Sequence, residues 1–255
     1  TGAAALAAYG ALRAGAGLVY LGVPASINDI LEVKCTEAIT VPLPETTAGT
    51  LSPEAADAII EWADKTDVVA IGPGLSRHPE TAKLVQQIVP RVDCPLVLDA
   101  DALNCLADTT PTSIADRRSP TIITPHPGEL SRLTGLDVEA IQNDRLGVAR
   151  RTASDFRAIT VLKGAGTIVA EPGGRAWVIQ WATDALATGG TGDVLTGMIA
   201  AFIAGGDFFF DRVACAAHVH GKAGQLAAES AGDPAAVVAG DLLGFIGRAL
   251  SEEDG

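Results

Sequence analysis

Residues 67–76 read Asp-Val-Val-Ala-Ile-Gly-Pro-Gly-Leu-Ser, an apolar run without alternating polar positions that ends in a glycine-rich turn. Residues 95–99, Pro-Leu-Val-Leu-Asp, form a second run of this kind. Strands that are apolar at successive positions are typical of parallel sheets whose two faces are both covered. These two stretches therefore predict a parallel sheet between two layers of helices.

Strand-like and helix-like segments alternate along the rest of the chain. Expected strands span residues 18–23, 39–43, 68–72, 96–99, 121–124, 159–163, 167–170 and 176–180. Expected helices span residues 2–14, 53–63, 81–89, 128–134, 143–155, 191–204, 212–230 and 240–250. This order predicts a three-layer, doubly wound α/β fold with a mostly parallel sheet and helices on both faces. A Pro-Gly-Gly turn at 172–174 predicts an antiparallel hairpin at the sheet edge.

The composition limits the class of protein. The chain has 255 residues, 48% of them hydrophobic, and no linker-like segment divides it, which predicts one domain. It contains no apolar run of about 18 residues, so we expect no membrane span. The net charge of −13 argues against nucleic-acid binding and requires local donors for any anionic ligand. Four scattered cysteines indicate reduced thiols in a cytoplasmic protein rather than a zinc site.

Unusual residues follow four of the expected strands. The post-strand segments are Gly-Pro-Gly-Leu-Ser at 72–76, Asp-Ala-Asp-Ala-Leu-Asn at 99–104, Pro-His-Pro-Gly-Glu at 125–129 and Lys-Gly-Ala-Gly-Thr at 163–167. Ligands of open α/β sheets bind outside the carboxyl ends of the strands. The four segments therefore predict the rim of a single cleft.

The glycine-rich stretch at 187–199, Ala-Thr-Gly-Gly-Thr-Gly-Asp-Val-Leu-Thr-Gly-Met-Ile, runs directly into an expected helix. Backbone N–H groups at a helix N-terminus attract anions, so Gly189, Gly190, Thr191 and Gly192 are candidates for an anion hole. Asp193 is a candidate general base that takes a proton from a substrate hydroxyl beside that anion. The alternative is ordinary helix capping by an aspartate in the first turn.

The polar candidates on the rim each have a structural alternative. His126, between two prolines, suits a hydrogen bond or base stacking, but it also suits a satisfied loop histidine. Glu129 could hold Mg²⁺ through water, or simply complement a helix N-terminus. Asp99 and Asp101 suit Mg²⁺ or a ribose, or a capped turn. Lys163 could reach a nucleotide phosphate, or could merely lead into the hairpin.

Five motifs in this order together resemble one family. They are GPGL (72–75), LDADALN (98–104), TPHPGEL (124–130), LKGAGT (162–167) and ATGGTGDVLTGMIAA (187–201). Over residues 1–250 the chain resembles the ADP/ATP-dependent NAD(P)H-hydrate dehydratases of the ribokinase-like superfamily. This resemblance implies a hydro-lyase that repairs NADHX and NADPHX, the hydrated forms of the reduced cofactors, and yields AMP and phosphate when ADP is used.

The resemblance also implies roles for particular residues. Contacts to the hydrate substrate are implied for Ala3, Gly74, His126 and Asp193. Contacts to ADP or ATP are implied for Lys163, Gly164, Ala165, Gly166, Thr167 and Gly192. Mg²⁺ is implied between the phosphates, and a homotetramer as the assembly.

The chain departs from the family pattern in two places. The resemblance implies a further strand and glycine-rich turn before Thr1, and a longer Asn/Thr/Gly/Pro stretch where residues 181–186 read Trp-Ala-Thr-Asp-Ala-Leu. Two other functions stay open at this point: a small-molecule kinase for a vitamin alcohol, and a nucleotide-binding scaffold without catalysis.

Overall fold

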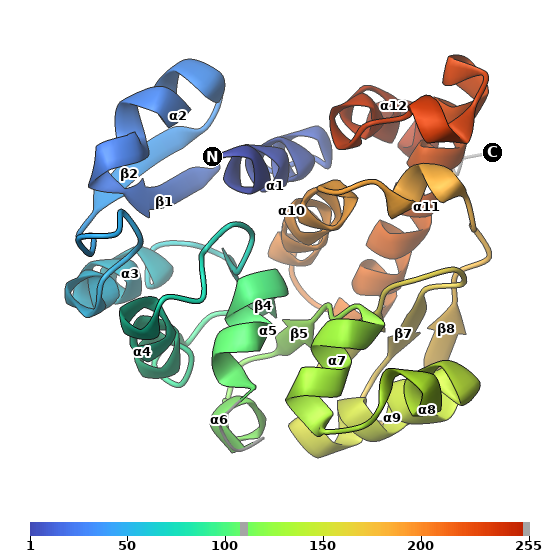
Figure 1. The fold of residues 1–255 in the computed structure, drawn as a ribbon, viewed down its shortest axis with the longest axis horizontal. Helices are drawn as coiled ribbons and strands as arrows, with labels where there is room; N and C mark the ends of the chain where they lie inside the picture. The colour runs from blue at the N-terminus through green and yellow to red at the C-terminus, as the bar shows by residue number, and fades with distance from the viewer. Residues whose placement is uncertain (108–111, 252–255) are drawn as a thin grey trace.

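A six-stranded mixed sheet forms the centre of the protein in a computed structural model, which describes residues 1–107 and 112–251 (Figure 1). Its strands follow chain order: β3 (Val69–Ile71), β4 (Leu96–Leu98), β5 (Thr121–Ile123), β6 (Ile159–Leu162), β7 (Ile168–Ala170) and β8 (Ala176–Val178). The first four strands are parallel to one another. β7 pairs antiparallel with both β6 and β8. The expected parallel sheet and the hairpin at its edge are therefore both present.

The first two expected strands lie outside this sheet. β1 (Tyr20–Pro24) and β2 (Ile39–Leu43) pair in parallel as a separate two-stranded sheet, joined by α2 (Asn28–Lys34) (Figure 1). Both strands keep several positions exposed or half-exposed, whereas every residue of β4, β5 and β6 is buried. Strands that are only partly buried, such as β1 and β2, are not covered by helices on both faces as the strands of the central sheet are.

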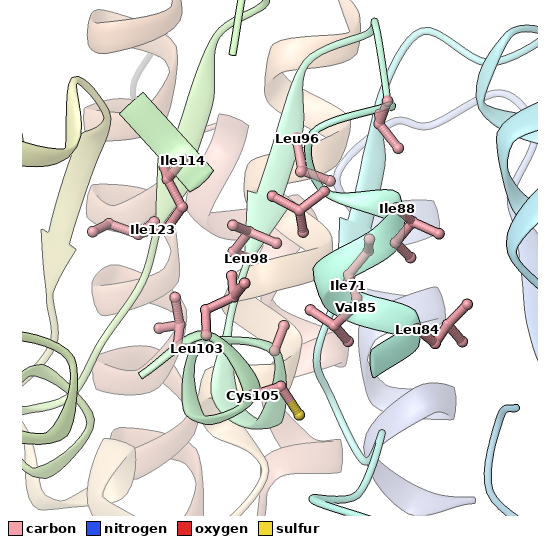
Figure 2. Packing of buried hydrophobic residues seen from close by; sticks show 14 of the residues in the cluster. Ile71, Leu84, Val85, Ile88, Leu96, Leu98, Leu103, Cys105, Ile114 and Ile123 are labelled. Carbon is pink, nitrogen blue, oxygen red and sulfur yellow. The ribbon is translucent and has the colours of Figure 1, made fainter. Parts of the chain in front are cut away.

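Alternate side chains of the central strands enter two different cores. Leu96 and Leu98 of β4 pack with α4 (Pro79–Ile88) and α5 (Ala100–Leu106), as Figure 2 shows. Val97, between them, packs on the other face with α10 (Thr191–Ala204) and α11 (Phe209–Ala231). The predicted three-layer arrangement is thus confirmed. Because the strands run in consecutive order, the helices that connect the parallel strands all lie on the first of these faces.

The second face carries an additional layer of helices, in which α1 (Gly2–Arg13) packs closely on α10. A Cβ atom on Gly197 of α10 would lie 1.9 Å from the carbonyl oxygen of Ala7, and one on Gly10 would lie 2.4 Å from that of Val194. The glycines let the two backbones touch, and Leu6 of α1 lies beside Gly190 at the start of α10. Helix α12 (Ala239–Ser251) packs against α11 and α10.

Several short helices were not expected from the sequence. Besides α2 and α5, these are α6 (Thr112–Ala115) and α8 (Val138–Asn143), while α3 (Ala56–Ala63), α7 (Pro127–Thr134) and α9 (Arg145–Phe156) match expected helices within a few residues. Helices of at most two turns leave little periodicity to detect. None of the helices in the described ranges is both long and apolar enough to cross a membrane.

Candidate active site

The carboxyl ends of the four parallel strands meet at one edge of the sheet, as the sequence predicts. Backbone hydrogen bonds continue the ladder just past the strands: Asp99 N–H donates to Ile71, Thr124 N–H to Leu98 and Lys163 N–H to Pro125. The segments after β3, β4, β5 and β6 are therefore held side by side. The start of α10 reaches the same edge, because Thr196 of α10 donates a hydrogen bond to Asp99 over 2.7 Å.

Lys163 is the centre of a buried cluster of charges. Its Nζ lies 2.6 Å from Oδ1 of Asp99 and 3.7 Å from Oε2 of Glu129, and these two carboxylates are 1% and 6% exposed. Burial alone would lower the pKa of Lys163, but the neighbouring Asp99 and Glu129 carboxylates outweigh it and raise the pKa. The ammonium is therefore charged and already paired within the protein.

Asp193 lies in the first turn of α10, beside the glycine loop. Gly190, just before the helix, has φ +97°, and a Cβ atom there would lie 2.7 Å from Leu6 Cδ1 and 3.8 Å from Oδ2 of Asp193. A Cβ atom on Gly192 would lie 3.4 Å from Lys163 Nζ. The base candidate and the ammonium thus flank the same short loop, in which the left-handed backbone at position 190 favours glycine.

The environment of Asp193 suits a general base. Burial raises the pKa of its carboxyl to about 6, the Asp99 carboxylate adds to this effect, and Lys163 opposes it. Glu129 and Asp101 also raise this pKa. A carboxyl that titrates close to neutral pH takes up and releases protons readily under working conditions.

In the predicted anion hole, the polar groups of Thr191 already form hydrogen bonds within the protein. The Thr191 hydroxyl donates to the carbonyls of Leu186 and Thr188, and its N–H donates to Thr188 over 3.4 Å. The buried His220 of α11 has Nε2 2.9 Å from the Thr191 carbonyl, and burial lowers the pKa of this imidazole to about 4. Thr191 and His220 therefore hold the loop in shape, and the helix geometry leaves the N–H of Gly192 free of a helical partner.

His126 and Glu129 cap α7 together. The Nδ1 atom of His126 accepts hydrogen bonds from the N–H groups of Gly128 and Glu129, and Oε2 of Glu129 accepts from the His126 N–H. Because Nδ1 is an acceptor, the ring proton belongs on Nε2. Burial lowers the pKa of His126, and its side chain is 49% exposed. The Nε2 atom of a neutral His126, which carries this proton, lies 3.5 Å from Oε1 of Glu129, and the half-exposed ring also leaves it accessible to a ligand.

Ala3 and Gly74 are also brought together. A Cβ atom on Gly74, which has φ +68°, would lie 3.1 Å from the Cβ of Ala3. Asp101 holds this loop by accepting from the Ser76 N–H over 2.9 Å, and Asn104 donates to the second oxygen of Asp101. Asp101 and Asn104 thus act as supports of the rim.

The loop at 163–167 depends on a residue that the sequence analysis missed. Gly164 and Gly166 have φ +143° and +67°, and Thr167 donates to the Gly164 carbonyl. Arg145, at the start of α9, donates to the carbonyls of Leu162, Lys163 and Gly166. A cation in the first turn of a helix opposes the helix dipole, and this is the one signal in the sequence that could have marked Arg145.

The described residues contain no group of three or more His, Cys, Asp or Glu side chains arranged to hold a metal ion. Asp99 and Glu129 are the buried carboxylates of the rim, and both accept hydrogen bonds or ion pairs from the protein. Mg²⁺ commonly binds through one or two carboxylates together with the phosphates of a substrate. The residues present therefore fit a metal that arrives with a nucleotide better than one held by the protein alone.

Comparisons with known proteins identify the family of the chain. A family model for NAD(P)H-hydrate dehydratase matches residues 1–246. The chain is 47% identical to the bifunctional NAD(P)H-hydrate repair enzyme Nnr of Moorella thermoacetica, over 99% of this chain and 48% of that protein. The chain spans about half the length of the first curated relatives it matches.

Solved structures show the same fold. The ADP/ATP-dependent NAD(P)H-hydrate dehydratase of Bacillus subtilis, co-crystallised with ATP and Mg²⁺ and soaked with CoA, superposes with a TM-score of 0.82 at 31% identity, covering 98% of this chain and 87% of that one. A ribokinase-like superfamily protein of Enterococcus faecalis gives a TM-score of 0.81 at 22% identity, covering 98% and 82%, and supports the fold alone. With the family model matching nearly its whole length, the chain belongs to the NAD(P)H-hydrate dehydratase family.

Proposed function

We propose that this chain catalyses the nucleotide-dependent dehydration of NADHX and NADPHX to NADH and NADPH, with AMP and phosphate as the other products when ADP is used. The observation that carries the proposal is the placement of Asp193. Its carboxyl, with a pKa of about 6, adjoins the glycine loop at the start of α10. The match of residues 1–246 to one family supports a single catalytic domain.

The proposed chemistry converts a poor leaving group into a good one. Asp193 takes the proton from the hydroxyl of the hydrated nicotinamide ring, and the hydroxyl oxygen attacks the terminal phosphoryl group of the nucleotide. The N–H groups of the 189–192 loop, apart from that of Thr191, which donates to Thr188, stabilise the charge of the transferred phosphoryl group. The ring nitrogen then pushes out phosphate, and loss of a ring proton restores the dihydropyridine. The elements of water leave the hydrate and hydrolyse one phosphoanhydride, so the reaction balances.

Other residues of the rim bind and orient the two substrates in this proposal. His126 donates its Nε2–H to the hydrate, and Ala3 and Gly74 form the wall beside it. The backbone from Lys163 to Thr167, with Ala165 and Gly166 at its tip, and Gly192 opposite, receives the phosphates of ADP or ATP. Mg²⁺ bound with the nucleotide would offset phosphate charge, with Glu129 within reach through water.

We further propose a cytoplasmic homo-oligomer, a tetramer, whose partners are these small molecules only. The net charge of −13 supports the absence of a nucleic-acid partner. Light scattering tests the assembly, and a monomer mass would contradict it.

The activity is tested by incubating the protein with NADHX, Mg²⁺ and either ADP or ATP, and following the return of NADH absorbance. The Asp193→Asn variant should lose conversion while it still binds nucleotide. Asp155→Asn, at an exposed position of α9, is the matched control and should keep full activity. If wild-type protein regenerates no NADH but phosphorylates a vitamin alcohol, the kinase alternative is correct. If it does neither and still binds nucleotide, the scaffold alternative is correct.

A further inference from the structure

Arg145 turns back from the start of α9 to the loop that follows β6. Its Nη2 lies 3.2 Å from the carbonyl oxygen of Leu162 and 3.4 Å from those of Lys163 and Gly166, while Nη1 contacts Gln142. One side chain thus binds carbonyl groups before and after the turn. The shape of the 163–167 loop therefore depends on a guanidinium from another element.

Gly164 leaves the space that this guanidinium occupies. A Cβ atom at Gly164 would lie 3.0 Å from Nη1 and 3.1 Å from Nη2 of Arg145, and φ of +143° is itself unfavourable for any other residue. The position of the Arg145 guanidinium therefore depends on glycine at position 164.

The carbonyl contacts decide where the N–H groups of the loop point. In a trans peptide unit the C=O and N–H bonds point in opposite directions. The carbonyls of Lys163 and Gly166 point at Arg145. The N–H groups of Gly164 and Thr167, which belong to the same peptide units, therefore point away from the guanidinium. Backbone N–H groups that face away from the guanidinium in this way are hydrogen-bond donors for an anion.

Arg145 also differs from Lys163 in its charge balance. Lys163 is paired with Asp99 and Glu129, so much of its charge is offset within the protein. Within residues 1–107 and 112–251, no carboxylate lies within 4.0 Å of the Arg145 guanidinium. A guanidinium stays protonated at any working pH. In a chain with net charge −13, this is an uncompensated positive charge directly beneath the loop.

We propose that Arg145 is the positioning residue of the nucleotide site: it holds the 163–167 loop with the N–H groups of Gly164 and Thr167 facing the phosphates, and it supplies the positive charge that the paired Lys163 does not. The identity of the anion as ADP or ATP rests on the proposed function. The role of Arg145 rests on its own contacts.

The test compares Arg145→Gln and Arg145→Lys with Arg151→Gln, an exposed position on the same helix whose guanidinium binds Asp144. Calorimetry gives the affinity for ADP with Mg²⁺, and steady-state kinetics give kcat and KM for each substrate. Arg145→Gln should weaken ADP binding and raise the KM for ADP by about 10-fold to 100-fold, as expected for lost hydrogen bonds from a charged group. KM for NADHX and kcat at saturating ADP should change by less than about 2-fold, because the affected binding is specific to one substrate.

Arg145→Lys keeps the charge without the fork and should fall between wild type and Arg145→Gln, and Arg151→Gln should match wild type. The inference is overturned if Arg145→Gln binds ADP as wild type does, if both KM values rise equally, or if wild type binds no ADP. Should Arg145→Gln fail to fold, Arg145→Lys carries the test, and wild-type ADP affinity in that variant contradicts the inference. ADP binding that depends on Arg145 without NADHX conversion refutes the proposed function and leaves this inference standing.

Discussion

Replacing Lys163 with methionine tests the charge cluster at the carboxyl edge of the sheet. Methionine keeps an apolar chain of the length of the lysine stem but removes the ammonium that lies 2.6 Å from Asp99 and 3.7 Å from Glu129. Both carboxylates then remain buried without their cation, and Asp193 loses the one positive charge that holds down its pKa. Stability and the pH dependence of catalysis should therefore change together.

The size of the stability change follows from burial. The Lys163 side chain is 18% exposed and that of Asp99 is 1% exposed. Breaking such a pair by removing one partner costs about 3–5 kcal/mol, and the residual exposure of Lys163 favours the lower end. For a domain of this size, about 3 kcal/mol corresponds to a fall in melting temperature of roughly 6–12 °C. The exposed pair Lys65–Glu61, 58% and 72% exposed, supplies the control, because Lys65→Met should cost less than about 1 kcal/mol.

The catalytic effect has a definite sign. The ionised form of Asp193 is the proposed base, so the rate should fall as the pH drops through its pKa of about 6. Without Lys163 this pKa rises, and the acid limb of kcat/KM for NADHX moves to higher pH. Denaturant unfolding and a pH profile of NADH formation measure the two effects. If Lys163→Met unfolds within about 1 kcal/mol of wild type and its acid limb does not move, the reasoning about this cluster is refuted.

Three further predictions test other parts of the structure. Asp193→Asn should abolish catalysis. Its stability relative to wild type should increase as pH rises from 3.8, the pKa of the unfolded carboxyl, to about 6, because the wild-type carboxyl must ionise while buried. Denaturant unfolding across that range measures the stability difference between the two proteins, and a difference that stays constant would count against this prediction. His220→Gln removes a buried neutral imidazole, so the stability advantage of wild type over this variant should shrink as pH falls from about 6.5 toward about 4, and parallel unfolding curves at both pH values would contradict the burial argument. Gly72→Ala places a Cβ atom 1.8 Å from the Asp99 carbonyl oxygen at φ +135° and should lower the free energy of unfolding by more than about 2 kcal/mol. Gly244→Ala, with no atom within 4 Å of its Cβ position, should raise it by about 0.5–1 kcal/mol. Equal melting temperatures for the two variants would show that the structure around Gly72 relaxes freely.

The central sheet could be predicted because its strands are marked by local side-chain patterns. β4, β5 and β6 are apolar at nearly every position, and each is followed by residues unusual for a loop. Parallel strands bring these loops to one edge whatever the details of packing. The proximity of Asp99, His126 and Lys163 could therefore be predicted from the sequence.

Other features could not be predicted from local sequence patterns. β1 and β2 carry a strand pattern, but nothing local indicates that they form their own sheet. The helix at Ala100–Leu106 was not among the expected helices, because its two turns leave too little periodicity to distinguish it from a capped turn. Arg145 was missed because its partners are backbone carbonyls, which have no sequence signature.

By itself the sequence determined the layered α/β fold, the edge of the sheet where the site lies, and the family, since periodicity and the order of motifs are properties of neighbouring residues. Only the tertiary structure decided which charges meet. Lys163 pairs with Asp99 from 64 residues away, Thr196 joins them from α10, and Arg145 fixes the loop that follows Lys163. Charge pairing and pKa depend on distances of a few ångströms and on exclusion of water, and both arise only when distant segments pack together.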